Sequence, residues 1–222
     1  MSLIIFLFSI AITVVAQIMV HSQFKKAGKI QGKSGLTGFQ TAKKILDQNG
    51  LSEVKIIQSS GKLSDYYDSR NKVLALSSDV YNKSSIAAIA VAAHECGHAL
   101  QDKYNYSYLT LRQSLYPLVS VTSNIAPIII ILSFLFASTG LLKIGIATFT
   151  ISLFFTLITL PVEFDASKRA LNVIQSQNLV LDDSEFKTAK KVLDAAALTY
   201  VAAFVTSLLE LVRLIIIAKS NE

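Results

Sequence analysis

Two histidines of this 222-residue chain, His94 and His98, lie four positions apart in the segment SIAAIAVAAHECGHALQ. Residues at this spacing share one face of an α-helix, and Ser84 or Ser85 would cap such a helix. Both imidazoles could then bind one zinc ion, at nitrogen–metal distances of about 2.0–2.1 Å. Glu95 is rotated by about 100° from His94, where its carboxylate would meet an attacking water without binding the metal. The pattern predicts a zinc helix with two ligands and a general base; the plainer alternative is a buried helix that happens to carry two histidines.

A catalytic zinc commonly takes three protein ligands and leaves a fourth position for water. We expect Glu163 to be the third ligand, because it follows an apolar segment at a predicted helix start. The remaining histidine, His21, is the other candidate, and Glu163 could alternatively serve only as a negative charge at a helix N-terminus. Cys96, the single cysteine, is interpreted as a small packing residue rather than a ligand or nucleophile. The predicted cofactor is one Zn²⁺ per chain, held by His94, His98 and Glu163.

The composition is typical of a membrane protein. Hydrophobic residues make up 52% of the chain and charged residues 16%, whereas a soluble domain has about 25% charged residues. Residues 3–20 form an apolar run long enough for a hydrocarbon core about 30 Å thick. Lysines follow this run rather than precede it, which indicates an uncleaved anchor and not a secretory leader. Three further predicted spans cover residues 118–138, 144–160 and 200–218, and the first two of these form a membrane hairpin.

Two polar parts, residues 22–117 and 162–199, separate the predicted spans. In the first part, residues 54–58 and 72–77 have the composition of short strands, so we expect a small sheet packed against the zinc helix. The predicted fold is a mainly α membrane protein, with about four transmembrane helices and a small α+β zincin-like cytoplasmic domain built round the HExxH helix. Residues 1–222 are interpreted as a single membrane-bound domain.

Positively charged residues predict the orientation in the membrane. Lysines and arginines gather in the loop after the first span and in the loop after the hairpin, whereas the short loop inside the hairpin has only Lys143. The positive-inside rule places both large loops in the cytoplasm and both chain termini outside. Because the hairpin crosses the membrane twice, His94, His98 and Glu163 would lie on the same side. We therefore predict a multi-pass protein of the cell membrane with its metal site on the cytoplasmic side.

The formal net charge of +6 does not indicate a nucleic-acid partner. The excess lies close to a hydrophobic segment, which fits the anionic headgroups of a lipid bilayer better than DNA. Inside the last predicted span, Glu210 and Arg213 are three apart and share a helix face. An ion pair that fixes packing is favoured there over a polar cavity wall.

The motifs SIAAIAVAAHECGHALQ, LPVEFDASKRAL and LTYVAAF resemble the bacterial neutral zinc metallopeptidases of the YugP type. The resemblance covers most of the chain, and that family is related more distantly to HtpX-like and CAAX prenyl protease membrane peptidases. It implies zinc ligands and a general base at the four positions already named: His94, His98 and Glu163 as ligands, Glu95 as base. The distant relatives tend to have an aspartate four residues after the ligand glutamate, where this chain has Ser167. Asp165 could support a ligand histidine instead, although its spacing places it on another helix face.

The predicted reaction is hydrolysis of peptide bonds, in a peptide or membrane-protein substrate, by a water that gives its proton to Glu95. Arg169 and the tyrosines are candidate donors to the oxyanion, unless Arg169 only pairs with Asp165 one turn earlier. The strand around residues 73–76 would either receive an extended substrate at its edge or form plain core sheet. Two other classes stay open: a zinc hydrolase of non-peptide amides or esters, and a non-catalytic membrane scaffold with a structural metal site. Nothing in the sequence indicates an oligomeric state.

Overall fold

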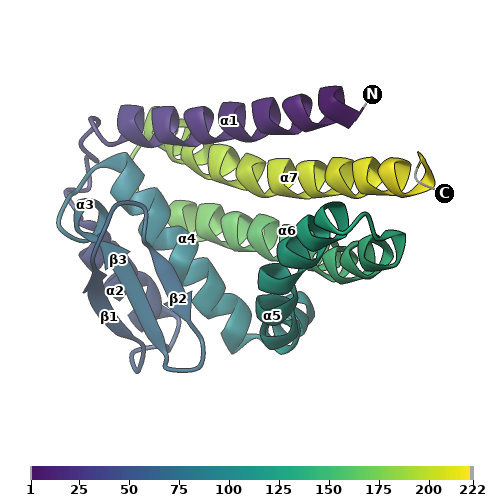
Figure 1. Ribbon diagram of the computed structural model, residues 1–222. Helices are drawn as coiled ribbons and strands as arrows, with labels where there is room; N and C mark the ends of the chain where they lie inside the picture. The colour runs from purple at the N-terminus through teal and green to yellow at the C-terminus, as the bar shows by residue number, and fades with distance from the viewer. Residues whose placement is uncertain (1, 221–222) are drawn as a thin grey trace. The chain divides into compact units, whose positions relative to one another are not determined.

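The computed structural model describes residues 2–220, which fall into two compact units (Figure 1). The first unit takes the described residues of Met1–Gln17, Ser107–Pro161 and Leu198–Glu222. The second unit takes Ile18–Tyr106 and Val162–Ala197. All the residues predicted to form the metal site therefore belong to one unit, the second.

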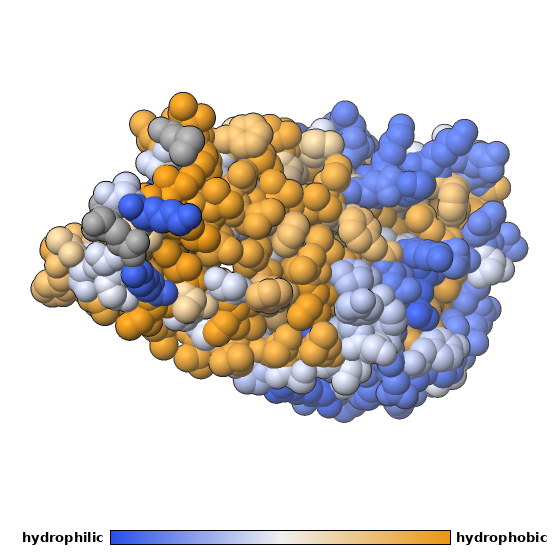
Figure 2. Space-filling view, turned by 90° about the vertical axis from the view of Figure 1, so that its right-hand side faces the viewer, coloured by the Kyte–Doolittle hydropathy of each residue, from blue (hydrophilic) through white to orange (hydrophobic). Residues whose placement is uncertain are grey.

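Four helices of the described chain are long and apolar enough to cross a membrane. They are α1 (Ser2–Ala27), α5 (Ser107–Leu135), α6 (Thr139–Ser176) and α7 (Asp183–Ser220). Many of their large hydrophobic side chains are exposed, and Figure 2 shows hydrophobic residues gathered over a broad area of one face. Such an area is unfavourable in water and favourable in lipid. The predicted class, a mainly helical protein with about four apolar helices and a small sheet, is confirmed.

The helices α6 and α7 have 38 residues each, a length of about 57 Å at 1.5 Å per residue, against a hydrocarbon core of about 30 Å. The predicted spans 144–160 and 200–218 thus occupy only a part of each helix. Pro161 does not end α6, although its position in the sequence marks a return to polar residues. At the start of α7, the Asp182 carboxylate accepts a hydrogen bond from the Glu185 amide at 2.8 Å, as an N-cap does. Both helices consequently extend from the first unit into the second.

The first unit holds the ion pair predicted inside the last span. Arg213 donates to both carboxylate oxygens of Glu210, at 2.8 Å from Nε and 2.5 Å from the terminal nitrogen. Its guanidinium carbon also lies 5.1 Å from the centre of the Phe6 ring. The bidentate geometry satisfies both charges, which fits the packing role favoured from the sequence. Glu210 also lines a cavity of about 360 Å³. A packing ion pair and a polar cavity wall are therefore compatible roles for this residue.

The second unit contains a three-stranded sheet with the order β1-β3-β2 (Figure 1). Its strands are β1 (Lys55–Ser59), β2 (Tyr66–Asp68) and β3 (Val73–Ser77). The strands predicted at 54–58 and 72–77 are confirmed to within one residue, whereas the three-residue β2 was not predicted. Because β3 pairs with β1 on one side and β2 on the other, it has no open edge along residues 73–75. At Ser77 the amide donates to Asp65 at 2.7 Å. The expectation that this strand could add an extended substrate at its edge is therefore wrong, and β3 is core sheet.

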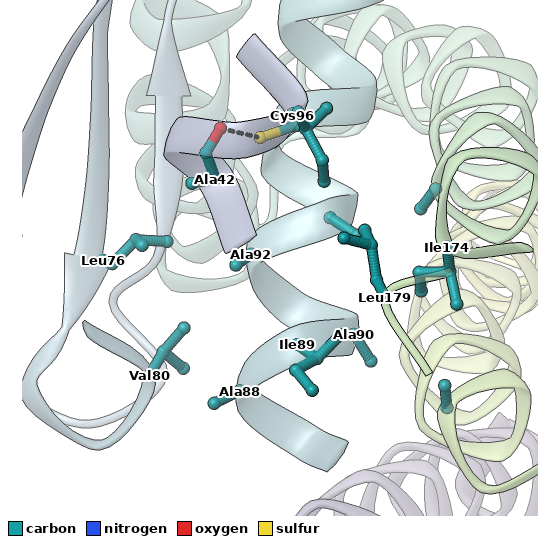
Figure 3. Packing of buried hydrophobic residues seen from close by; sticks show 14 of the residues in the cluster. Ala42, Leu76, Val80, Ala88, Ile89, Ala90, Ala92, Cys96, Ile174 and Leu179 are labelled. Atoms are coloured by element: carbon teal, nitrogen blue, oxygen red, sulfur yellow. Dashed lines mark hydrogen bonds between the residues drawn. The ribbon is translucent and has the colours of Figure 1, made fainter. Parts of the chain in front are cut away.

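The helix α4 (Ile86–Lys103), which carries both candidate histidines, is the centre of the second unit. Of the two predicted caps, Ser85 is the N-cap, and its hydroxyl accepts from the Ala88 amide at 3.2 Å. Nearly all of the helix is buried, which small alanine side chains permit because neighbours can approach closely. Figure 3 shows α4 with Leu76 and Val80 on one side and with Ile174 and Leu179 on another. The helices α2 (Gly38–Gln48) and α3 (Ser78–Tyr81) also contact it.

Candidate metal centre

His94, His98 and Glu163 come together in the second unit, the two histidines from α4 and the glutamate from α6. Their potential ligand atoms all lie within 4.8 Å of one another. One carboxylate oxygen of Glu163 lies 3.3 Å from Nε2 of His94 and 3.6 Å from Nε2 of His98. Two imidazole nitrogens and a carboxylate oxygen around one point are a usual ligand set for zinc. The residues present thus fit the predicted metal.

Glu163 lies inside α6 and not at a helix start, because α6 begins at Thr139. The alternative role as a helix N-terminal charge is therefore excluded. The side chain is buried, with 2% of the residue exposed. Burial alone would raise the pKa of this carboxyl, but the two imidazoles of His94 and His98 beside it outweigh burial and hold the pKa well below its usual range. The group is accordingly an ionised carboxylate, the form that binds a metal.

Gly97, between the two histidines, sets how closely α4 and α6 approach. A Cβ atom at this position would lie 2.5 Å from the backbone oxygen of Ala166, closer than non-bonded atoms can come. Only glycine therefore fits where α6 passes α4, and the close approach carries Glu163 towards the histidines. A small residue inside the HExxH motif was the only signal of this contact in the sequence.

The far side of each imidazole is also occupied. Nδ1 of His98 lies 3.0 Å from Oε1 of Gln101, and Nδ1 of His94 lies 3.2 Å from the hydroxyl of Ser167. With Nδ1 engaged, Nε2 of each ring is the nitrogen that faces Glu163. Ser167 lies four residues after Glu163, one turn further along α6. Neither Gln101 nor Ser167 was predicted, although Gln101 follows His98 by three residues and so shares its helix face.

Asp165 and Arg169 lie beyond the residues that contact the two imidazoles. Asp165 accepts from Nε2 of Gln101 at 2.9 Å, and so reaches His98 only through that amide. Arg169 donates from Nε to Asp165 at 2.6 Å, so the pairing one helical turn apart is present. The guanidinium of Arg169 lies 5.8 Å from the ring centres of both Tyr104 and Tyr106.

The other candidates from the sequence lie as follows. Glu95 is buried on α4, with 8% of the residue exposed, next to His94 in the chain. His21, the alternative third ligand, is exposed on α1 and does not belong to the described ligand cluster. Cys96 is fully buried, and its Sγ lies 3.8 Å from the Ala42 carbonyl (Figure 3). Burial raises the pKa of the Cys96 thiol, which keeps it neutral and suits a packing residue.

Comparison with known proteins decides the family. A family model described as "putative neutral zinc metallopeptidase" matches residues 2–219. The chain belongs to this family. It is also 46% identical over 202 residues to the "Putative membrane protease YugP" of Bacillus subtilis (strain 168), a match that covers 91% of this chain and 89% of that protein. No solved structure matches the chain.

Membership of this zinc metallopeptidase family implies zinc as the metal and a peptide as the substrate. The resemblance stated from the sequence is thereby confirmed. The similarity to a membrane protease and the four apolar helices together indicate a multi-pass membrane protein.

Proposed function

We propose that this protein is a zinc-dependent endopeptidase that cleaves peptides or membrane proteins close to the cytoplasmic surface of the cell membrane. The observation that carries the proposal is the convergence of His94, His98 and Glu163 within 4.8 Å, in a chain of the zinc metallopeptidase family. In this proposal the three side chains hold one zinc ion through Nε2, Nε2 and a carboxylate oxygen. When bound, zinc would act as a Lewis acid that polarises the scissile carbonyl and lowers the pKa of a water to about 7.

Glu95 is the proposed general base. Its place one residue after His94 turns its carboxylate by about 100° away from that ligand, towards the reacting water rather than the metal. The carboxylate accepts a proton from the water as the water oxygen bonds to the scissile carbon. When the carbon–nitrogen bond breaks, the same carboxyl returns that proton to the leaving amine. Glu95 therefore ends each cycle as the carboxylate it began as.

Asp165 and Arg169 act outside the reacting atoms in this proposal. The Arg169 guanidinium donates to Asp165 at 2.6 Å, which favours a supporting role over the predicted alternative of an oxyanion donor. The rings of Tyr104 and Tyr106 also contact the Arg169 guanidinium and help to hold it beside Asp165.

The proposed topology follows the distribution of positive charge. Residues 3–20, 118–138, 144–160 and 200–218 cross the bilayer, and residues 22–117 and 162–199 lie in the cytoplasm. Both termini would then be outside the cell. Substrates would reach the site at or near the bilayer surface, because Glu163 follows the end of the third span by three residues.

The decisive experiment compares the parent protein with Glu95→Gln, His94→Ala and Glu163→Ala, each purified in detergent. Glu95→Gln should lose cleavage of a quenched-peptide panel and keep one zinc per chain, whereas the two alanine variants should lose zinc. Turnover by Glu95→Gln, or unchanged zinc content in both alanine variants, would contradict the proposal. Cleavage of lipid amides or esters but not of peptides would instead identify a non-peptide hydrolase. Zinc bound without any turnover in the parent would identify a scaffold.

A second experiment addresses the substrate. Peptides trapped by Glu95→Gln and identified by mass spectrometry would give its identity.

A further inference from the structure

We infer that Gln101 is a positioning residue of the metal centre: its side-chain amide selects the tautomer of His98 and ties α4 to the helix that carries Glu163. The inference rests on the proposed function of that site. Gln101 is fully buried, with 0% of the residue exposed, although glutamine is a polar side chain that is usually exposed. Every polar atom of its amide has a partner, so the burial carries no desolvation penalty from an unmade hydrogen bond.

The partners of the amide nitrogen decide which way the amide faces. Nε2 donates to the backbone oxygen of Val162 at 2.7 Å and to Oδ2 of Asp165 at 2.9 Å. A carbonyl and a carboxylate can only accept, so the reversed amide would set Oε1 against two acceptors. Oε1 must therefore face Nδ1 of His98, which lies 3.0 Å away.

The orientation of the amide in turn decides the tautomer of the ring. An amide oxygen only accepts, so Nδ1 of His98 must carry the hydrogen and Nε2 must hold the lone pair. That lone pair faces the Glu163 carboxylate, where the metal would bind. His94 has no equivalent constraint, because the hydroxyl of Ser167 at its Nδ1 can donate or accept. Gln101 thus prepares one of the two histidines for metal binding before the metal arrives.

The same amide also joins the two ligand-bearing helices. Val162, whose carbonyl accepts from Gln101, directly precedes Glu163 on α6. Loss of the Gln101 amide would therefore affect His98 through its ring orientation and Glu163 through the position of its backbone. Asp165 is in turn held by Arg169, so the two outer residues named from the sequence act on His98 through Gln101.

The first test is the zinc affinity of Gln101→Leu, measured by chelator competition on the detergent-purified full chain. A side chain that orients a metal ligand typically contributes about 10–100-fold to metal affinity, and we expect a loss in that range. Gln48→Leu, an exposed glutamine at the end of α2 in the same unit, is the matched control and should bind zinc as the parent does. Thermal unfolding of the zinc-free proteins separates a lost ligand geometry from a fold that has become unstable.

The second test reverses the polarity of the network. Gln101→Glu keeps the acceptor for His98 but points a carboxylate at the carboxylate of Asp165, so zinc affinity should fall. Adding Asp165→Asn replaces the facing carboxylate with a neutral amide, which removes the repulsion between two like charges. The double variant should therefore bind zinc more tightly than Gln101→Glu alone. A residue that only filled space would give additive losses and no such recovery.

The outcomes separate this inference from the proposed function. A parent protein without zinc would refute both. A parent that binds zinc, together with a Gln101→Leu variant of equal affinity, would overturn the role of Gln101 and leave the proposed function intact. If the losses of zinc affinity from Gln101→Glu and Asp165→Asn were additive, and the unfolding temperature of the zinc-free proteins fell in proportion, Gln101 would have only a structural role. That result would overturn the assignment of the tautomer.

Discussion

Polar side chains are used differently in the two units. In the first unit, many hydroxyl groups donate to a carbonyl one turn earlier in their own helix, as Thr150 does to Ile146 at 2.8 Å and Thr159 to Phe155 at 2.8 Å. In the second unit, polar groups join segments far apart in the sequence. Gln101 reaches Val162 across 61 positions. The backbone amide of Lys33 donates to the Glu185 carboxylate at 2.7 Å, across 152 positions.

The difference reflects what each unit has to hold in place. A hydroxyl bonded to its own helix has no unmade hydrogen bond in an apolar environment and leaves the helix to pack by shape. A metal site needs atoms from separate helices at defined distances, and only bonds between those helices supply that constraint. We therefore expect substitutions of polar or close-packed residues to have large effects in the second unit and small effects in the first.

The largest effect is expected for Glu163→Ala, which removes the carboxylate that faces both histidines. Loss of a group that orients a ligand typically weakens metal binding by about 10–100-fold, and loss of the ligand itself should weaken it more. Peptide cleavage should disappear with the zinc. Metal analysis and a peptide assay on the same preparation measure both. Thr159→Ala, one turn earlier on α6, is the control, because its hydroxyl donates to Phe155 of the same helix. Equal zinc loss in both variants would contradict the comparison.

Gly97→Ala should have the next largest effect. The new methyl group would overlap the Ala166 backbone oxygen, and overpacking of this kind costs about 1–3 kcal/mol in the free energy of unfolding. Because the clash pushes α6 away from α4, zinc affinity should fall as well.

Gly140→Ala in the first unit is its counterpart. The Cβ would come no closer than 3.9 Å to a neighbouring heavy atom, so unfolding should be unchanged or up to about 1 kcal/mol less favourable. Denaturant unfolding of the two variants, and zinc titration of each, would test the pair; a stable Gly97→Ala protein with parental zinc affinity would refute the close-packing argument.

Tyr67→Phe is expected to have a moderate effect in the second unit. The phenol of Tyr67 on β2 donates to Asp102 on α4 at 2.8 Å, and burial, followed by this carboxylate, raises the pKa of the phenol so that it stays a donor. Loss of one such bond to a charged group costs about 1.5–3 kcal/mol. Chemical unfolding should show this loss, while zinc affinity should stay within twofold or so, because the bond lies outside the ligand network. A large loss of zinc would place β2 within the site.

The smallest effect is expected for Thr150→Val in the first unit, whose hydroxyl bonds only its own helix among the described contacts. The change in unfolding free energy should be within about 0.5 kcal/mol. Ser152→Ala is the informative partner variant, because the Ser152 hydroxyl bonds that of Ser123 on α5 at 2.9 Å and so joins two helices. Bonds between membrane helices average about 0.6 kcal/mol. A larger loss from Thr150→Val than from Ser152→Ala would break the proposed difference between the units.

Local pattern was sufficient to predict much of this protein. Apolar runs long enough for a bilayer predicted the four long helices, because length and hydropathy are properties of contiguous residues. The four-residue spacing of His94 and His98 placed both rings on one helix face for the same reason. Strand composition located β1 and β3, and Ser85 was one of two serines recognised as a cap. Glu163 was named as a partner of the histidines because it follows a predicted span, although it lies inside α6 and not at a helix start.

How these parts meet depends on contacts between distant segments, which the sequence pattern does not contain. The neighbours on both sides of β3, the passage of α6 through Pro161, and the contact that makes Gly97 necessary all depend on segments distant in the chain. The same holds for Gln101, whose amide is oriented by Val162 and Asp165 from another helix. Residue type and spacing select the candidate ligands because those are local properties. Which groups orient the ligands depends on the packing of α4 against α6, which no local pattern encodes.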